Sequence, residues 1–414
     1  MRALWLLPVA QALFAQQPVD PTALLVRARD TLVARDERLP DYTCVQTVDR
    51  QYFKSPAAGD AASCRQIAAL NPDTWSLQST DRLRLEIKVS HGGEIGSWPG
   101  SRFTSHTIFD LIGNGPYGTG MLGALIADIF IDGHATYAYA GKVTASPLYV
   151  YNYQVPVESS HYHVKAGSQW PVSAFYGAFW LDSNSLELHR LFVQTNELPP
   201  ETGACEISTN VEYQDAKVGG GVFLLPERST IRMLMRDHTE SRTTAIYSDC
   251  HEYRGESTIH FDELPAAGRS ESAGASVPPV PAGLALSLAL TEPIDLGTAA
   301  AGDVVNARLR RAVREPHSKA ILAPAGSTAH LRVVEMQRWL DSPPEFKIGL
   351  VLESLTAGGI SRPLNAVIHR EGVLILPALG QSPLVAIFKF PAHKPPYRVP
   401  AGFQTDWLTV ASPP

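Results

Sequence analysis

A long series of short alternating segments between Ala135 and Phe261 constrains the fold most strongly. Within each segment apolar and polar residues alternate, as they do when successive side chains point to opposite faces of a strand. No helical pattern intervenes, which argues against a parallel sheet because parallel strands need long crossover connections. The sequence therefore predicts a long antiparallel sheet from these segments: ATYAYAG, LYVYNYQV, SHYHVKAG, residues 178–193, CEISTNVEYQ, FLLPERSTIRMLM, TTAIYSDCHEY and ESTIHF.

The clearest hairpin of this series runs from Ala178 to Val193. Its two alternating runs are joined by four turn-forming residues, Asp182 to Ser185. Asp, Asn and Ser side chains bond their own backbone in tight turns, so this spacing predicts two antiparallel strands. Phe179 and Leu181 are expected on the buried face.

The segment before this series predicts a helix, several strands and a second helix. Asp20 as N-cap and Pro21 at the first helical position begin the first helix. Asp81 to Ser90 is the cleanest strand, with one apolar face formed by Leu83, Leu85, Ile87 and Val89. Met121 to Ile131 reads as a helix, whose apolar stripe consists of Leu122, Leu125, Ile126 and Ile129. Such a stripe is expected to cover the apolar side of a curved sheet.

Three parts of the chain resemble the LolA-like lipoprotein carrier proteins. These are the hairpin FWLDSNSLELHR, the opening helix followed by a Tyr and a Gln-containing strand, and the step NVEYQDAKVGGGVFLLPERSTIRM. The resemblance implies a curved antiparallel sheet whose concave face binds acyl chains. A glycine-rich insertion from His91 to Gly120 departs from the family pattern, and no ligand residue of the family is carried over. Our own candidates for ligand contact are Leu83, Leu85, Ile87, Leu122, Leu125, Ile129, Phe179 and Leu181.

Composition divides the chain into two domains. DELPAAGRSESAGASVPPVP, from Asp262 to Pro281, has almost no large apolar residue and marks a linker. Beyond it, Val-Pro-Ala-Gly or Ala-Pro-Ala-Gly precedes an apolar run three times, beginning at residues 280, 323 and 399. Each repeat predicts a turn that starts a strand. This tail resembles the C-terminal β-barrel of the TrbI-like proteins of type IV secretion outer-membrane complexes, without their long helical hairpin.

We therefore predict a mainly β fold with a few helices, of the α+β class. Residues 1–15 are expected to be a signal peptide and residues 20–262 a LolA-like curved antiparallel half-barrel sheet packed on helices. Residues 263–279 form the linker, and residues 280–414 a small all-β barrel or sandwich. The signal peptide follows from Arg2, an apolar run, and the small Ala15 before the expected cleavage. Gln16 stands where a bacterial lipoprotein would need Cys.

Charge and cysteine content support an exported globular protein. A net charge of -6 and the lack of a Lys/Arg run argue against a nucleic-acid partner, and no apolar run approaches the roughly 18 to 20 residues of a transmembrane helix. Four cysteines without a CxxC motif favour two disulfides over free thiols. Of three pairings we expect Cys44 with Cys64 and Cys205 with Cys250, because each closes a loop within one half of the first domain.

Catalytic and metal-binding motifs are weak. Gly113 to Gly118 satisfies G-x-G-x-x-G, but the surrounding chain is antiparallel, so a glycine-rich loop is favoured over a nucleotide site. His161 and His163 alternate as metal ligands would, with His91, His134 or His189 as third partners, yet no acidic residue has a convincing spacing, and a solvent-facing pair is favoured. The sequence holds no G-x-S-x-G or S-x-x-K motif, so we expect no catalytic residue, metal or cofactor.

Tyrosines mark two neighbouring strands of the expected sheet. Tyr149, Tyr151 and Tyr153 share one strand face, with Tyr137 and Tyr139 on the preceding strand and Trp180 on the hairpin. This predicts a structural aromatic ladder, or an exposed stripe for a partner if the rings reach solvent.

The leading hypothesis is a non-enzymatic periplasmic or extracellular protein that carries a hydrophobic ligand, a lipid or an acylated protein. The alternative is a docking component of an envelope or secretion assembly, with peripheral association to an outer membrane. A hydrolase is the third hypothesis, because Ser, His and acid residues that are distant in sequence can converge in space.

Overall fold

The structure is a computed structural model of the 414-residue chain. It describes residues 20–56, 63–90, 93–103, 108–112, 115–132, 134–165, 169–253, 278–315, 320–370, 373–374 and 384–411. The expected signal peptide, the ESTIHF segment and nearly all of the linker lie outside these residues, so the domain boundary stays a prediction.

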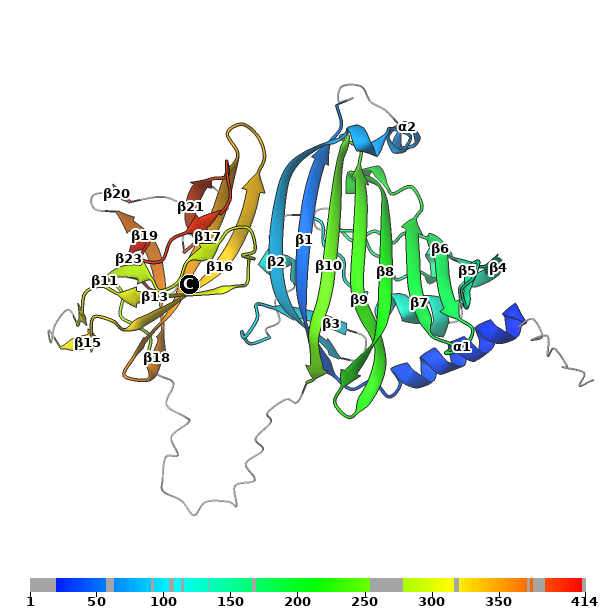
Figure 1. Cartoon of the computed structure of the whole chain (residues 1–414), viewed down its shortest axis with the longest axis horizontal. Helices are drawn as coiled ribbons and strands as arrows, with labels where there is room; N and C mark the ends of the chain where they lie inside the picture. The colour runs from blue at the N-terminus through cyan, green and yellow to red at the C-terminus, as the bar shows by residue number, and fades with distance from the viewer. Residues whose placement is uncertain are drawn as a thin grey trace, which may run out of the picture.

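The first unit is an antiparallel sheet with the order β3-β2-β1-β10-β9-β8-β7-β6-β5-β4 (Figure 1). The segment SHYHVKAG is not a strand in the described residues; only His163 forms a bridge, to Val172. The strands are β1 (Tyr42–Lys54), β2 (Ser76–Ser90), β3 (Gly93–Ser97), β4 (Thr136–Lys142), β5 (Leu148–Val155), β6 (Phe175–Asp182), β7 (Leu188–Thr195), β8 (Ala204–Val218), β9 (Gly221–Met235) and β10 (Thr239–Glu252).

The predicted hairpin is confirmed as β6 and β7. The side chain of Asp182 holds its turn, because Oδ1 accepts hydrogen bonds from the N–H groups of Asn184 (2.7 Å) and Ser185 (3.1 Å). The predicted strand at residues 81–90 is the second half of β2, with Leu83, Leu85 and Ile87 buried.

Helices pack against both faces of this sheet. α1 (Pro21–Asp36) begins at the predicted N-cap, where Asp20 Oδ1 accepts a hydrogen bond from the Thr22 N–H at 3.0 Å. On the same face lie α3 (Ile108–Ile112), α4 (Ala124–Ile126) and the π-helical turn η2 (Ala127–Ile131). α4 and η2 take the place of the single helix expected from Met121 to Ile131. On the opposite face α2 (Cys64–Ala68) packs on Leu234. The remaining short turns are η1 (Pro72–Thr74), η3 (Val157–Ser159) and η4 (Pro200–Thr202).

The two expected disulfides are present, but the expected pairing is wrong. Cys44 pairs with Cys250, and Cys64 pairs with Cys205. Cys44 meets Cys250 because β10, although last in the unit, is the neighbour of β1. Cys64 begins α2, which crosses the outer face and brings the cysteine to β8. Both bonds therefore join residues far apart in sequence, separated by 206 and 141 positions, instead of closing local loops.

The second unit is a separate antiparallel sheet with its own core. Its main order is β19-β23-β11-β13-β16-β17-β21. The expectation was a small barrel or sandwich, and among the described residues no pairing closes this sheet into a barrel. The strands are β11 (Ala285–Leu290), β12 (Ile294–Asp295), β13 (Val304–Leu309), β14 (Val313–Arg314), β15 (Ile321–Ala323), β16 (Thr328–Trp339), β17 (Glu345–Ala357), β18 (Ile360–Pro363), β19 (Asn365–Arg370), β20 (Val373–Leu374), β21 (Ala386–Pro391), β22 (Arg398–Val399) and β23 (Gln404–Val410).

The three Pro-Ala-Gly repeats form turns before strands, as predicted. Gly283, Gly326 and Gly402 have φ values of +84°, +87° and +79° and stand just before β11, β16 and β23. Each glycine N–H donates to a carbonyl oxygen of another segment of this unit, at 2.7 to 2.8 Å. The repeats therefore share one conformation, which glycine adopts without the steric cost of a Cβ.

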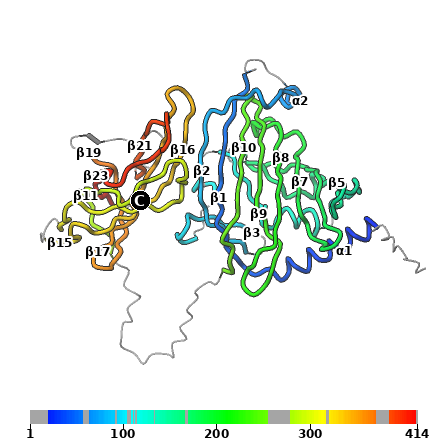
Figure 2. Tube along the Cα trace, viewed as in Figure 1, coloured from blue at the N-terminus to red at the C-terminus, as the bar shows by residue number. Residues whose placement is uncertain are grey.

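Strand β2 joins the two units (Figures 1 and 2). One edge of β2 pairs with β1. On the other edge, β3 pairs with residues 86–90 and the end of β16 pairs with residues 79–81. Between them the Ala301 N–H donates to Arg82 O at 2.9 Å, and the Arg84 N–H donates to Ala301 O at 2.6 Å. The edge of β2 is therefore covered along most of its length, which removes a template for unwanted strand pairing.

Gly302 offers a test of this junction. A Cβ at Gly302 (φ +109°) would lie 2.0 Å from Arg84 O, whereas a Cβ at Gly326 (φ +87°) would meet nothing within 4 Å. Gly326→Ala should cost about 1 to 2 kcal/mol of stability, the penalty of a left-handed backbone alone. Gly302→Ala should cost more, by about 1 to 3 kcal/mol, because the backbones must separate.

The measurement is chemical denaturation together with amide hydrogen exchange. Faster exchange at Arg84 and Ala301 is expected for Gly302→Ala and not for Gly326→Ala. Equal effects of the two substitutions would show that the junction does not depend on this close approach.

Candidate functional site

The eight apolar residues predicted to contact a ligand all belong to one buried cluster. Leu83, Leu85 and Ile87 lie on β2, and Phe179 and Leu181 lie on β6. Leu122, Leu125 and Ile129 lie in the segment that covers the sheet. Each is at most 5% exposed. We call residues 108–112 and 115–132 the plug, because they fill the apolar face with side chains of the protein itself.

Aromatic rings fix the plug end nearest β6. The Phe130 ring lies 4.9 Å from that of Phe179, which stacks on Tyr151 at 5.3 Å. Tyr149, Tyr151 and Tyr153 are at most 6% exposed, so they form the structural ladder and not an exposed stripe.

Trp180 does not belong to the tyrosine ladder. Strand register places it opposite Val150 and Arg190, whereas Tyr149 and Tyr151 face Leu181 and Phe179. Since neighbouring residues of a strand point to opposite faces, Trp180 lies on the other side of the sheet. There the Arg190 guanidinium lies 4.8 Å from the Trp180 ring centroid, within range of a cation–π contact.

Glycines let the plug loop approach the sheet closely. A Cβ at Gly115 (φ +124°) would lie 2.5 Å from Tyr52 Oη, and a Cβ at Gly118 would lie 2.5 Å from Ile231 Cδ1. Close packing therefore accounts for two glycines of the G-x-G-x-x-G pattern, while Gly113 lies outside the described residues.

Hydrogen bonds anchor the plug to the sheet. Glu94 Oε1 accepts the N–H groups of Gly120 (2.9 Å) and Leu122 (3.1 Å). The Tyr42 hydroxyl donates to Leu122 O at 3.2 Å, and the Tyr117 hydroxyl donates to Gln46 Oε1 at 2.5 Å. Burial raises the pKa of the Glu94 carboxyl, and it raises the pKa values of the Tyr42 and Tyr117 hydroxyls, with the Glu94 charge as a further cause. The tyrosines therefore stay neutral donors throughout the physiological range.

A buried ion pair lies under the plug loop. The Arg50 guanidinium donates to Asp81 through Nε at 2.6 Å and Nη2 at 2.9 Å, and the Tyr52 hydroxyl donates to the same carboxylate at 2.9 Å. The side chains of Arg50 and Asp81 are 3% and 4% exposed. Among the described residues Arg50 Nη1 has no hydrogen-bond partner. The bidentate hydrogen bonds offset part of the desolvation of these charges, and removing one partner would leave the other charge buried and unpaired.

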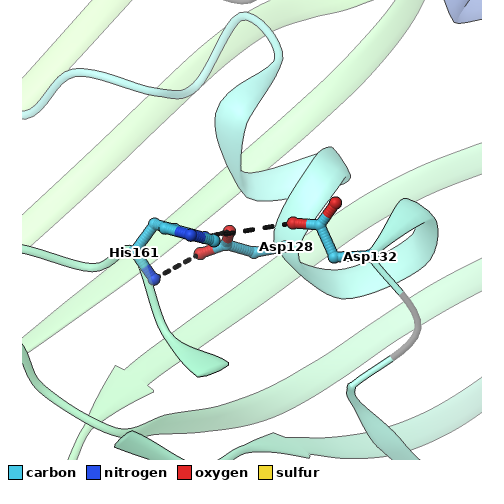
Figure 3. Close-up of side chains that lie close together, drawn as sticks. All are labelled: Asp128, Asp132 and His161. Carbon is cyan, nitrogen blue, oxygen red and sulfur yellow. Dashed lines mark hydrogen bonds and ion pairs between the residues drawn. The ribbon is translucent and has the colours of Figure 1, made fainter. Parts of the chain in front are cut away.

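The π-helical turn at the plug end nearest β6 also carries two carboxylates that lie beside an imidazole, and the three side chains form a cluster (Figure 3). His161 Nδ1 lies 2.6 Å from Asp128 Oδ1 and 3.9 Å from Asp132 Oδ2. The backbone N–H of His161 donates to Asp128 Oδ2 at 3.1 Å. The Asp128 side chain is 7% exposed, whereas that of His161 is 68% exposed. The hydrogen bond with Asp128 raises the pKa of the His161 imidazole.

Sequence reasoning singled out His161 but missed both aspartates. They precede the histidine by 33 and 29 positions, so no local spacing links them to it. His163, the other half of the predicted pair, lies apart from the cluster, and its Nδ1 is 3.2 Å from Trp170 O. Among the other proposed partners, His134 and His189 do not join the cluster, and His91 lies outside the described residues.

Comparison with known proteins adds little. No family model matches the chain, and no curated protein matches it. Among solved structures, the crystal structure of LolA superfamily protein NE2245 from Nitrosomonas europaea is similar with 12% identity, over 60% of this chain and 96% of that one. Its TM-score of 0.25 is too low to support an argument about fold or function.

The Glu94 anchor predicts a pH-dependent stability. Because burial raises its folded-state pKa, the contribution of Glu94 is largest at low pH, where the carboxyl is neutral, and decreases as the pH rises through the folded pKa. Glu94→Gln keeps an acceptor oxygen for both N–H groups, which reach the same Oε1, and removes the charge. We expect this variant to be more stable than wild type at neutral pH and equally stable below about pH 4.

Glu94→Ala is the matched variant. It leaves the two N–H groups without this acceptor and should lose about 1 to 3 kcal/mol at every pH. Urea unfolding across a pH series measures both variants. A difference between Glu94→Gln and wild type that does not change with pH would contradict the assignment.

Proposed function

We propose that the protein is a non-enzymatic, exported binding or carrier protein for a hydrophobic ligand, either a lipid or an acylated protein. The observation that carries the proposal is the division of one buried apolar cluster between a sheet face and a separate plug. In this proposal the plug occupies the ligand's place, and an acyl chain replaces its apolar contacts when the plug moves aside.

The construction of the plug supports displacement. Its three helical pieces contain five, three and five residues. Helices this short are marginal by themselves in water, so packing on the sheet must hold them. An acyl chain offers the sheet the same kind of contact, at about 0.8 kcal/mol for each buried CH₂ group. The exchange therefore conserves apolar burial.

Two observations bear on where the protein works. Both pairs of cysteines form disulfides, which persist in oxidising compartments outside the cytosol. The resemblance of the hairpin and its neighbours to LolA-like carriers implies a ligand with acyl chains and a place in the cell envelope. The proposal includes an envelope protein that donates or accepts the ligand. It also includes peripheral association with an outer membrane.

No helix in the described residues is both long enough and apolar enough to cross a bilayer.

The test compares two matched substitutions in delipidated protein. Ile129 lies in the plug and Ile348 lies in the core of the second unit, and both are at most 1% exposed. Ile→Val should cost about 1 kcal/mol at either position. At Ile129 the substitution destabilises the state in which the plug covers the sheet, and not the state in which the plug has moved aside. The affinity for a dansyl-labelled undecanoic acid probe should therefore rise by up to about fivefold. Ile348→Val should leave the affinity unchanged.

Mass spectrometry of lipids extracted from natively purified protein provides an independent readout. Co-purified lipid together with saturable probe binding is expected. The proposal is wrong if the protein carries no lipid and no variant binds the probe saturably.

A further inference from the structure

We propose that Asp128, Asp132 and His161 bind one divalent first-row transition-metal ion. Their ligand atoms, two carboxylate oxygens and one imidazole nitrogen, lie within 4.8 Å of one another (Figure 3). Imidazole and carboxylate without thiolate suit ions such as Zn²⁺ or Co²⁺, and three protein ligands on one side leave positions open for water or another ligand.

The local fold brings the two aspartates together. Asp132 closes the π-helical turn, in which its N–H donates to Ala127 O five residues back, at 3.0 Å. Residues four positions apart lie on the same face of a helical turn, so the side chains of Asp128 and Asp132 lie side by side. Arg29 holds the same turn from α1 by donating to Phe130 O at 2.6 Å and to Ile131 O at 3.4 Å. The carboxylates are thus placed by backbone contacts and not by an ion pair with Arg29.

Asp128 is the residue that points to a ligand. It is a nine-tenths buried carboxylate, and among the described residues it interacts with His161 alone. Buried charges in proteins are normally paired with a cation or coordinate a metal, because an isolated charge loses its hydration. No Lys or Arg of the described residues forms an ion pair with Asp128 or Asp132. A dication would neutralise both carboxylates at once.

The histidine can open the space that an ion needs. Metal–ligand distances of about 2.0 to 2.2 Å in a tetrahedral site put neighbouring ligand atoms about 3.3 to 3.6 Å apart, which is more than the 2.6 Å between His161 Nδ1 and Asp128 Oδ1. The His161 ring is 68% exposed and can turn without repacking the core. The ion takes the place of the proton that now joins the two groups. It would then tie the end of the plug to the segment before β6.

Zinc titration of the full chain by calorimetry, after treatment with a chelator, tests the site. One equivalent of Zn²⁺ should bind, and Asp128→Asn and His161→Ala should each weaken binding by at least about tenfold. His163→Ala is the matched control, since His163 lies two positions along the same segment and outside the cluster. It should leave the affinity unchanged.

Cobalt provides a second readout that does not depend on affinity. Co²⁺ should give a visible absorption band in wild type and His163→Ala, and the band should disappear in Asp132→Asn, while circular dichroism confirms that each variant is folded. The site is refuted if His161→Ala binds Zn²⁺ as tightly as wild type, or if His163→Ala weakens binding as much as His161→Ala does.

Discussion

Strand β2 is the element on which the rest of the structure depends, because both of its faces and its free edge are used. Its inward side chains, among them Leu83, Leu85 and Ile87, form part of the core under the plug. Its outward arginines reach the second unit, where Arg84 pairs with Asp303 and Arg82 donates to Gly297 O. A shift of one residue in its register would exchange these two sets and disrupt both units.

The plug combines short helical pieces with buried polar anchors. Apolar contacts alone would hold a plug of this size on the sheet but would not fix its position, because hydrophobic contacts have little directionality. Glu94 and Tyr42 add direction, since each bonds a backbone group of the loop. These bonds are also costly to leave unmade inside the protein. The plugged state is therefore well defined while its helices remain weak.

The parts of the fold that follow from neighbouring residues could be predicted from the sequence. The alternation of apolar and polar residues predicted the buried face of β2, and the turn at Asp182 predicted the β6–β7 hairpin. The Pro-Ala-Gly repeats predicted three turns, each of which contains a glycine with a positive φ. All eight ligand candidates lie in one buried cluster. Alternation along a strand and the i, i+3, i+4 spacing along a helix both identify the face that is buried.

Features that depend on contacts distant in sequence could not be predicted. The pairing of Cys44 with Cys250 requires knowing that the last strand of the first unit lies beside the first. The run from Met121 to Ile131 has helical spacing, yet the structure divides it into a short α-helix and a π turn. His161 was identified without its acidic neighbours, because Asp128 and Asp132 lie 33 and 29 positions before it and only the fold brings them together.

The glycine-rich insertion, which departs from the LolA-like pattern, also supplies part of the plug that covers the sheet face. Gly115 has to be glycine because a Cβ there would press on Tyr52 and Arg50, the residues of the buried ion pair with Asp81. Asp81 lies in β2 and pairs in register with Gln337 of the second unit. The loop over the apolar face thus packs on an ion pair that lies beside the point where the two units meet.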